Sequence, residues 1–306
     1  GSELAIGFLQ ARTLLRKLAP HVVIGFGGYA SVPTMLAAGL GGYAAAIHEQ
    51  NAVLGRANRM LASRVKKIAT CFDNVAGVPE GMDTKVVCTG MPVRPAVIAC
   101  RDTPYPELDD DSPLHLLVFG GSQGARVLSD VVPHAVGRLG GHLKQRLRIT
   151  QQCRSEDLDS IRDEYANAGV AAELGIFFDD LPKRIGASHL VIGRSGASTV
   201  AELTTIGRPA ILIPYPSATD DHQSGNAHAI DEAGGGWLIN EAAFTANALA
   251  KRLDSLFGLP AVLQRSAANA RAAGRPEAAI NLANLVSGII LNDTNDNGAT
   301  SERAAE

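Results

Sequence analysis

The sequence has little of what marks several large protein classes. It carries a net charge of only -3, contains no block of lysine or arginine and has few aromatic residues (5%), so it predicts no nucleic-acid partner. Its four cysteines, Cys71, Cys88, Cys100 and Cys153, form no C-x-x-C pair, which argues against a zinc or redox motif and fits a reducing compartment. The apolar run at residues 34–47 is too short to cross a membrane.

Some familiar binding motifs are also missing. The chain has no G-x-G-x-x-G loop and no Walker lysine, which disfavours an NAD-type oxidoreductase. His222 and His228 lack the spacing of metal ligands, so we expect no metal site. The chain begins with Gly1-Ser2 rather than with methionine, which indicates either a fragment or the remnant of an expression tag.

What the sequence does contain is a repeated alternation of short apolar runs and helical stretches. With 306 residues and 46% hydrophobic content, we expect about two domains with buried cores. Runs that are apolar on both faces and alternate with helices predict parallel sheets covered by helices. The predicted strands lie at residues 21–28, 44–50, 66–72, 85–90, 114–121, 147–153, 173–178, 189–194, 209–214 and 235–240.

A stretch rich in proline and aspartate, residues 90–113, predicts a boundary between two such sheets. We therefore expect a partial first domain over residues 1–95 and a second domain over residues 96–273, with a complete sheet of about six strands. A last helix is expected over residues 274–291, and a disordered polar tail over residues 292–306.

The segment "LHLLVFGGSQGARVLSD", residues 114–130, has the layout of a phosphate-binding turn. A strand ends in Gly120 and Gly121, and a helix follows, so backbone N–H groups and the positive end of a helix dipole face an anion. Ser122 adds a hydroxyl donor. The alternative is an ordinary tight turn in which the glycines only supply permissive dihedral angles.

The segment "GRSGASTVAE", residues 193–202, has a similar layout. Ala197, Ser198 and Thr199 would offer free N–H groups at a helix start. Glu202 could accept two hydrogen bonds from a vicinal diol such as a ribose. Taken alone, however, the spacing of Thr199 and Glu202 favours a capping box over a ligand site.

Three further segments carry polar side chains at strand ends. Residues 214–227 include Asp220, Asp221, His222, Gln223 and Asn226, which suit either sugar hydroxyls or an N-capping loop. Residues 45–59 place His48, Glu49, Gln50 and Asn51 at the edge where ligands sit in open α/β sheets. Arg94 could clamp a diphosphate or be an ordinary surface arginine. Turns from two sheets would converge on one cleft in a glycosyltransferase with two Rossmann-like domains.

These segments together resemble the MurG family. The resemblance rests on "FGGYAS", "HEQNAVLGRAN", "TGMPVRP", "VFGGSQGA", "FFDDL", "RSGASTVAEL" and "GRPAILIPYPSATDDHQ", followed by the helix "AAINLANLV", in that order along almost the whole chain. It implies an α/β fold of the GT-B type, with two Rossmann-like domains facing a cleft and the last helix packing back on the first domain. It also implies an inverting transfer of GlcNAc from UDP-GlcNAc to the muramoyl 4-hydroxyl of lipid I, which gives lipid II in peptidoglycan synthesis without a cofactor.

The resemblance assigns roles to individual residues. The second domain would bind UDP-GlcNAc, with Ser122 on the α-phosphate, the backbone of Phe178 on the uracil edge and Glu202 on the ribose. The diphosphate and the sugar would be held by Arg94, Ala197, Ser198, Thr199, His222, Gln223 and Asn51. The acceptor diphosphate would lie along Gly27, Gly28 and Tyr29. His222-Gln223 stands where the family commonly has two glutamines.

One family segment has no match in this chain. Family members open with a strand and a "GGTGGH"-like loop whose histidine is a leading candidate for the general base. By the size of a βα unit, roughly 60 to 80 residues would be missing, so the first domain would be incomplete. We therefore expect a poorly stable N-terminal half and a chain that binds UDP-GlcNAc but transfers it poorly or not at all.

Other functions remain open at this point. A UDP-GlcNAc 2-epimerase, another two-domain UDP-sugar enzyme or a binding-only UDP-sugar module would share the donor site. The family reading adds an anionic membrane surface and cell-wall synthesis proteins as partners, and a peripheral location on the cytoplasmic side of the inner membrane. The first helix could meet the membrane with Leu4, Phe8, Leu9 and Leu15 beside Arg12, Arg16 and Lys17, or it could simply pack on its sheet.

Overall fold

The computed structural model describes residues 2–120 and 126–303, and for residue 2 and residues 293–303 the backbone alone. The chain folds into two compact units, one of residues Gly1–Pro92 with Glu277–Glu306, the other of residues Val93–Pro276. Below they are called the first and the second unit. Each is built on a parallel sheet, so the predicted α/β class is confirmed. All ten predicted strands are present.

The first unit has a four-stranded parallel sheet in the order β1-β2-β3-β4. These strands are β1 (Val22–Gly25), β2 (Ala44–Glu49), β3 (Lys67–Thr70) and β4 (Val86–Cys88). Strand β2 is buried on both faces, because alternate side chains point to opposite sides. Ala45 and Ile47 pack in one cluster, whereas Ala44 and Ala46 pack with Ile289 on the other face.

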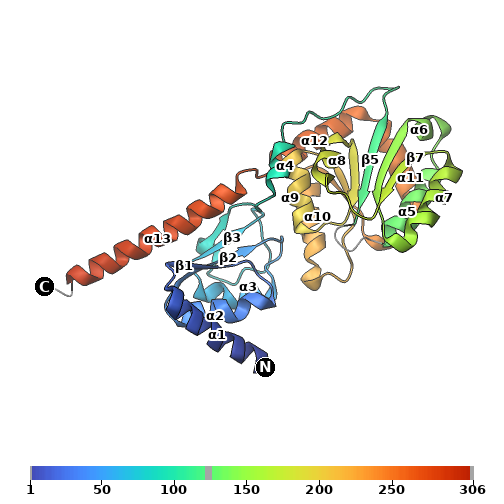
Figure 1. Ribbon diagram of the computed structural model, residues 1–306. Coiled ribbons are helices and arrows are strands. Elements are labelled where there is room, and N and C mark those ends of the chain that lie inside the picture. Colours follow the sequence, from blue (N-terminus) through green and yellow to red (C-terminus); the bar gives the residue numbers. More distant parts are fainter. Residues whose placement is uncertain (1, 121–125, 304–306) are drawn as a thin grey trace. The chain divides into compact units, whose positions relative to one another are not determined.

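Helices cover both faces of this sheet, as Figure 1 shows. On one side lie α1 (Ser2–Leu18), α2 (Val32–Leu40) and α3 (Arg56–Leu61), and on the other lies α13 (Ala278–Arg303). The sequence predicts a tail without regular structure from residue 292, whereas α13 extends to Arg303. No proline follows Ile290 to stop the helix.

The second unit has a six-stranded parallel sheet in the order β10-β9-β8-β5-β6-β7. Its strands are β5 (Leu114–Phe119), β6 (Leu147–Gln152), β7 (Ala171–Gly175), β8 (Leu190–Gly193), β9 (Ala210–Leu212) and β10 (Gly236–Leu238). The predicted strand at 173–178 is displaced, because β7 already ends at Gly175 and Phe178 lies beyond it in a turn.

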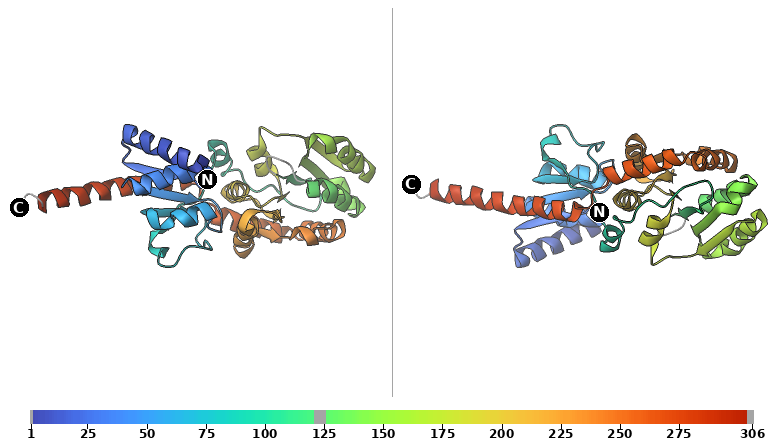
Figure 2. Two further views of the ribbon diagram at one scale, coloured as in Figure 1. Left: turned by 90° about the horizontal axis from the view of Figure 1, so that it is seen from below. Right: turned by 90° about the horizontal axis from the view of Figure 1, so that it is seen from above.

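Helices lie on both sides of this sheet as well (Figures 1 and 2). Helices α5, α7 and α11 pack together, and α4, α8, α9, α10 and α12 form the second group. Their bounds are α4 Pro95–Ala99, α5 Arg126–Gly137, α7 Leu158–Ala168, α8 Leu181–Ala187, α9 Ala197–Ile206, α10 His222–Glu232, α11 Ala246–Phe257 and α12 Pro260–Ala273, and the short α6 covers Gly141–Arg146.

The strand order of the second unit reverses between β5 and β8. From β5 the chain proceeds to β6 and β7 on one side, and from β8 to β9 and β10 on the other. In open α/β sheets, ligands bind outside the carboxyl ends of the strands at such a switch point. The backbone is also close-packed there, since a Cβ on Gly193 would lie 2.8 Å from the carbonyl oxygen of Phe119. The turns after Phe119 and Gly193 are therefore the first places to look for a site.

Candidate functional site

Helix α9 begins directly at this switch point. Its N-cap is Gly196, with an extended backbone (φ -60°, ψ 147°) and no side-chain cap. Ala197, Ser198 and Thr199 form its first turn, so their N–H groups have no intrahelical partner. The capping box suggested by the spacing of Thr199 and Glu202 is wrong, because Thr199 lies inside the helix rather than at its N-cap. The start of α9 is thus open to an anion.

Glu202 lies one turn into α9 and contacts a second predicted site residue. Its Oε1 accepts a hydrogen bond from Nη2 of Arg94 at 3.1 Å. The side chain of Glu202 is 14% exposed, whereas that of Arg94 is 58% exposed. Because the guanidinium of Arg94 is exposed, it can move away into solvent, so a ligand can replace it at Glu202.

The start of α10 is tied to the start of α9. The Ser195 hydroxyl donates to the carbonyl oxygen of Gln223 at 2.8 Å, and Nδ2 of Asn226 donates to the carbonyl oxygen of Ser195 at 3.0 Å. Ser195 and Asn226 are both fully buried. The structure therefore brings Gln223 beside the first turn of α9. Asn226 supports this arrangement rather than facing a ligand, which corrects its grouping with the sugar-binding candidates.

His222 opens α10 and follows a strained piece of backbone. Asp220 and Asp221 both have positive φ angles, 53° and 52°, which are uncommon for residues other than glycine and concentrate at functional sites. Nδ1 of His222 lies 2.6 Å from the carbonyl oxygen of Thr219, a contact that requires the proton on Nδ1. In the neutral ring, Nε2 is then an acceptor for a hydroxyl group.

Arg194 is a supporting residue that the sequence reasoning missed. Its Nη2 lies 2.6 Å from Oε2 of Glu241, and its Nη1 donates to the carbonyl oxygens of Ile213 and Pro214. Arg194 thus joins the loops that follow β8 and β9 at the carboxyl edge of the sheet. Its place at the end of the strand predicted over residues 189–194 was the available indication.

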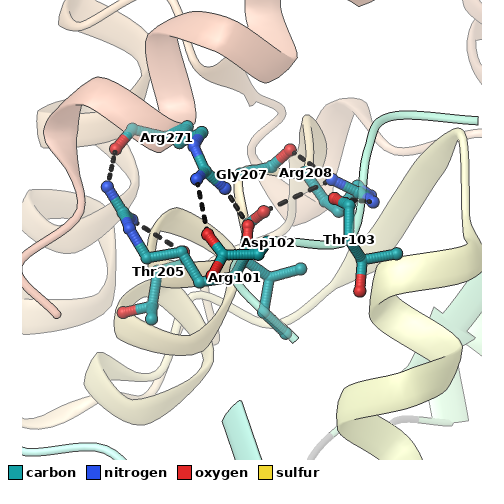
Figure 3. A network of polar contacts seen from close by, with 8 residues as sticks. Arg101, Asp102, Thr103, Thr205, Gly207, Arg208 and Arg271 are labelled. Atoms are coloured by element: carbon teal, nitrogen blue, oxygen red, sulfur yellow. Dashed lines mark hydrogen bonds and ion pairs between the residues drawn. The ribbon is translucent and has the colours of Figure 1, made fainter. Parts of the chain in front are cut away.

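A second group of arginines anchors the far end of α9 (Figure 3). Arg101 donates to the carbonyl oxygen of Thr205, and Arg271 donates to the backbone of Arg101. The buried Arg208 donates to carbonyl oxygens of Gly207 and Thr103 among others, and burial lowers its pKa to about 10. These cations neutralise the negative end of the α9 dipole and fix the helix that carries Glu202.

Phe178 lies in the turn between β7 and α8, at the edge of the sheet. Two strands, β5 and β6, separate β7 from β8. Within the described residues, no hydrogen bond uses the backbone of Phe177, Phe178 or Asp179. The backbone of this turn is therefore available to a ligand that extends along the carboxyl edge of the sheet.

The first unit holds Asn51 in a buried polar network around Glu49. The backbone N–H and Nδ2 of Asn51 both donate to Oε1 of Glu49, and Gly55 N–H and Asn58 Nδ2 donate to Oε2. His48 is buried beside them, with Nε2 3.0 Å from the carbonyl oxygen of Gly90. Burial lowers the pKa of His48, so the ring is neutral.

The predicted acceptor turn of the first unit follows β1. Gly27 and Gly28 have φ angles of 78° and 73°, which only glycine adopts easily, so the glycines are required by the turn itself. Tyr29 is exposed. Nε2 of Gln50 donates to the carbonyl oxygen of Phe26, which connects this turn to the segment that contains Asn51.

Ser122 lies outside the described residues, so its predicted phosphate contact stays a prediction.

Among the residues described, no group of three or more histidine, cysteine, aspartate or glutamate side chains could hold a metal ion. None of the described helices is both long and apolar enough to cross a membrane.

Comparison with known proteins identifies the chain. Glycosyltransferase family 28 matches through its N-terminal domain over residues 2–70 and its C-terminal domain over residues 115–282. The UDP-N-acetylglucosamine--N-acetylmuramyl-(pentapeptide) pyrophosphoryl-undecaprenol N-acetylglucosamine transferase of Paramagnetospirillum magneticum is 56% identical over 292 residues, 95% of this chain and 79% of that protein. The protein of the same name from Rhodospirillum rubrum is 55% identical, over 93% of this chain and 73% of that protein.

Solved structures agree with these relatives. The crystal structure of Acinetobacter baumannii MurG is similar with a TM-score of 0.80 at 29% identity, over 94% of this chain and 80% of that one. The UDP-GlcNAc 2-epimerase of Neisseria meningitidis shares the fold, with a TM-score of 0.64 at 13% identity over 94% and 80%. The chain belongs to glycosyltransferase family 28 and, within it, to the MurG family.

Proposed function

We propose that this chain is a hexosyltransferase that moves GlcNAc from UDP-GlcNAc to the muramoyl 4-hydroxyl of lipid I and so forms lipid II for peptidoglycan. The relatives named above support this substrate pair. The observation that carries the donor site is the meeting of three features at the carboxyl ends of β8 and β9. These are the open first turn of α9, the carboxylate of Glu202 and the start of α10 at Gln223, whose backbone carbonyl accepts from Ser195 and whose Oε1 accepts from the Tyr215 N–H.

The donor lies along the carboxyl edge of the second unit. The backbone of Phe178 pairs with the uracil, and Glu202 accepts hydrogen bonds from the ribose hydroxyls in place of Arg94. Ala197, Ser198 and Thr199 direct their N–H groups at the diphosphate and the sugar, together with Ser122. His222, Gln223 and Asn51 bind GlcNAc hydroxyls.

The transfer inverts the anomeric carbon, because the acceptor hydroxyl attacks from the side opposite UDP. The acceptor oxygen forms a bond to the anomeric carbon while a general base takes its proton, and the bond from the anomeric carbon to the diphosphate breaks, so negative charge develops on the leaving UDP. The dipole at the start of α9 and the guanidinium of Arg94 stabilise that charge. Because Ser195, Asn226 and the arginines behind α9 hold this helix in place, little reorganisation of its first-turn N–H groups accompanies the reaction.

The acceptor lies on the first unit, with its diphosphate along Gly27, Gly28 and Tyr29. This turn offers backbone N–H groups and glycines that leave room for phosphate oxygens, since a Cβ on Gly28 would meet nothing within 4 Å.

Helix α1 supports a peripheral place on the cytoplasmic face of the inner membrane, against anionic lipid. Leu4, Leu9, Leu14 and Leu18 of α1 are more than half exposed. The sequence reasoning also assigned Leu15 to this surface, but Leu15 is buried in a cluster with Ala11, and Phe8 packs against it. The double variant Leu9→Ser/Leu14→Ser tests the surface, and unchanged binding to anionic vesicles would remove it.

Product analysis tests the reaction. Incubation with UDP-GlcNAc and a lipid I analogue should release UDP and give a disaccharide product only when the acceptor is present, at the low rate expected above. Formation of UDP-ManNAc without acceptor would instead establish an epimerase, and UDP-GlcNAc binding with neither product would favour the binding-only alternative.

A further inference from the structure

The turn between β7 and α8, residues 175–180, is held by an arginine that has no assigned role. Arg184 forms a bidentate pair with Glu173, with Nη1 2.6 Å from Oε2 and Nη2 2.9 Å from Oε1. Its Nε donates to Oδ1 of Asp180 at 2.6 Å. One guanidinium thus joins the strand before the turn to the N-cap residue of α8.

The same guanidinium covers the ring of Phe178. Its central carbon lies 4.2 Å from the ring centroid, within the range of a cation–π contact. Gly175 lies close to the same ring, since a Cβ built there would be 2.9 Å from Cε1 and Cζ of Phe178. The ring is therefore confined by Arg184 and Gly175, and it is not free to stack on a base.

The backbone of the turn is fixed at its start and open at Phe178. The carbonyl oxygen of Gly175 accepts from the N–H of Cys153, and that of Ile176 accepts from Nε2 of Gln152. No hydrogen bond within the described residues uses the backbone of Phe178. A base can pair its hydrogen-bonding edge with Phe178 only if the N–H and C=O groups of Phe178 keep fixed orientations.

We propose that Arg184 is a positioning residue for uracil recognition. It holds Phe178 so that one backbone donor and one backbone acceptor match the O4 and N3–H groups of uracil. Cytosine carries the reverse pattern at these two atoms, so the fixed backbone discriminates against it. The inference rests on the proposed function, in which the backbone of Phe178 pairs with the base.

Calorimetric titration with UDP and with CDP tests the role without any need for turnover. The wild-type chain should bind UDP more tightly than CDP. In Arg184→Ala, UDP affinity should fall roughly tenfold while CDP affinity changes less than threefold, so the ratio of the two affinities falls. Gly175→Ala should act in the same direction, because its added methyl group displaces the Phe178 ring.

Controls separate positioning from general damage. Arg162→Ala removes a more exposed arginine that also pairs with a carboxylate, with Nη1 2.6 Å from Oδ1 of Asp159, and should leave the UDP:CDP ratio unchanged. If Arg184→Ala does not fold by circular dichroism, Glu173→Gln weakens the same clamp and takes its place. A wild-type preference for UDP that persists in these variants would overturn the role of Arg184. A wild-type chain with no preference would overturn the base contact of the proposed function instead.

Discussion

Two glutamates that the sequence places near strand ends have opposite surroundings. Glu49 in the first unit is 2% exposed, and donors from Asn51, Gly55 and Asn58 occupy both its oxygens. Glu202 in the second unit meets one exposed arginine. A carboxylate whose hydrogen bonds are filled by its own chain supports the fold, whereas one with a replaceable partner can bind a ligand.

Glu49→Gln should lower the free energy of unfolding by about 3 kcal/mol. The amide group of the new glutamine would face the N–H groups of Gly55 and Asn58, which now donate to Glu49. These buried donors would then lose their acceptor. Urea denaturation measures the loss, and Glu80→Gln at an exposed position should change the stability by less than about 0.5 kcal/mol. An equal, small effect of both variants would show that the network around Glu49 is not structural.

Glu202→Gln should weaken UDP-GlcNAc binding about thirtyfold, or about 2 kcal/mol, because a charged acceptor for the ribose hydroxyls is lost. Its melting temperature should match that of the wild type. Calorimetry measures the affinity, with Glu232→Gln on exposed α10 surface as the control. A large loss of stability with unchanged affinity would reverse the comparison with Glu49.

Arg94→Ala should separate the two roles of its guanidinium. UDP binding should weaken about fivefold, because a cation near the diphosphate is lost. Uridine, which has no phosphate, should bind equally well or about twofold more tightly, since Glu202 no longer has to release Arg94. If both ligands lose affinity to the same extent, Arg94 does not compete for Glu202.

His48 should make the first unit sensitive to acid. Burial lowers its pKa below 6.5, so the unfolded chain binds the proton more readily than the folded one. The contribution of the neutral His48 ring to the free energy of unfolding is therefore complete above pH 6.5, and it falls as the pH drops below 6.5. His48→Gln should lose less stability than the wild type between pH 7.5 and pH 5.5, measured by urea denaturation. Parallel curves would assign the acid sensitivity elsewhere.

Strand positions were predictable from the sequence because the alternation of short apolar runs with helical stretches is a local property of the chain. All ten predicted strands exist, and only the strand expected at 173–178 moves by several residues. That error has a tertiary cause: the ring of Phe178 folds back against Gly175 and Arg184, which local hydrophobicity does not reveal. The extension of α13 past residue 291 was missed because a polar composition alone does not stop a helix.

The sequence predicted which residues belong to the site, but it did not predict which of them contact one another. The sequence identified Arg94, Glu202 and Gln223 as candidates, but not that Arg94 pairs with Glu202 or that Ser195 connects to Gln223. It favoured a capping box at Thr199, because the start of a helix within one or two residues is poorly defined by sequence. Arg184 and Arg194 carry no motif, and their importance emerges only from contacts between distant segments.

On this proposal the second unit binds the nucleotide through the turn at 175–180 and the start of α9, while the network around Glu49 supports the fold. Hydrogen–deuterium exchange with and without UDP separates the two roles. Exchange at residues 176–180 and 197–202 should slow on UDP binding, and exchange at residues 49–58 should not change. Protection at residues 49–58 with none at the other two segments would assign nucleotide binding to the first unit instead.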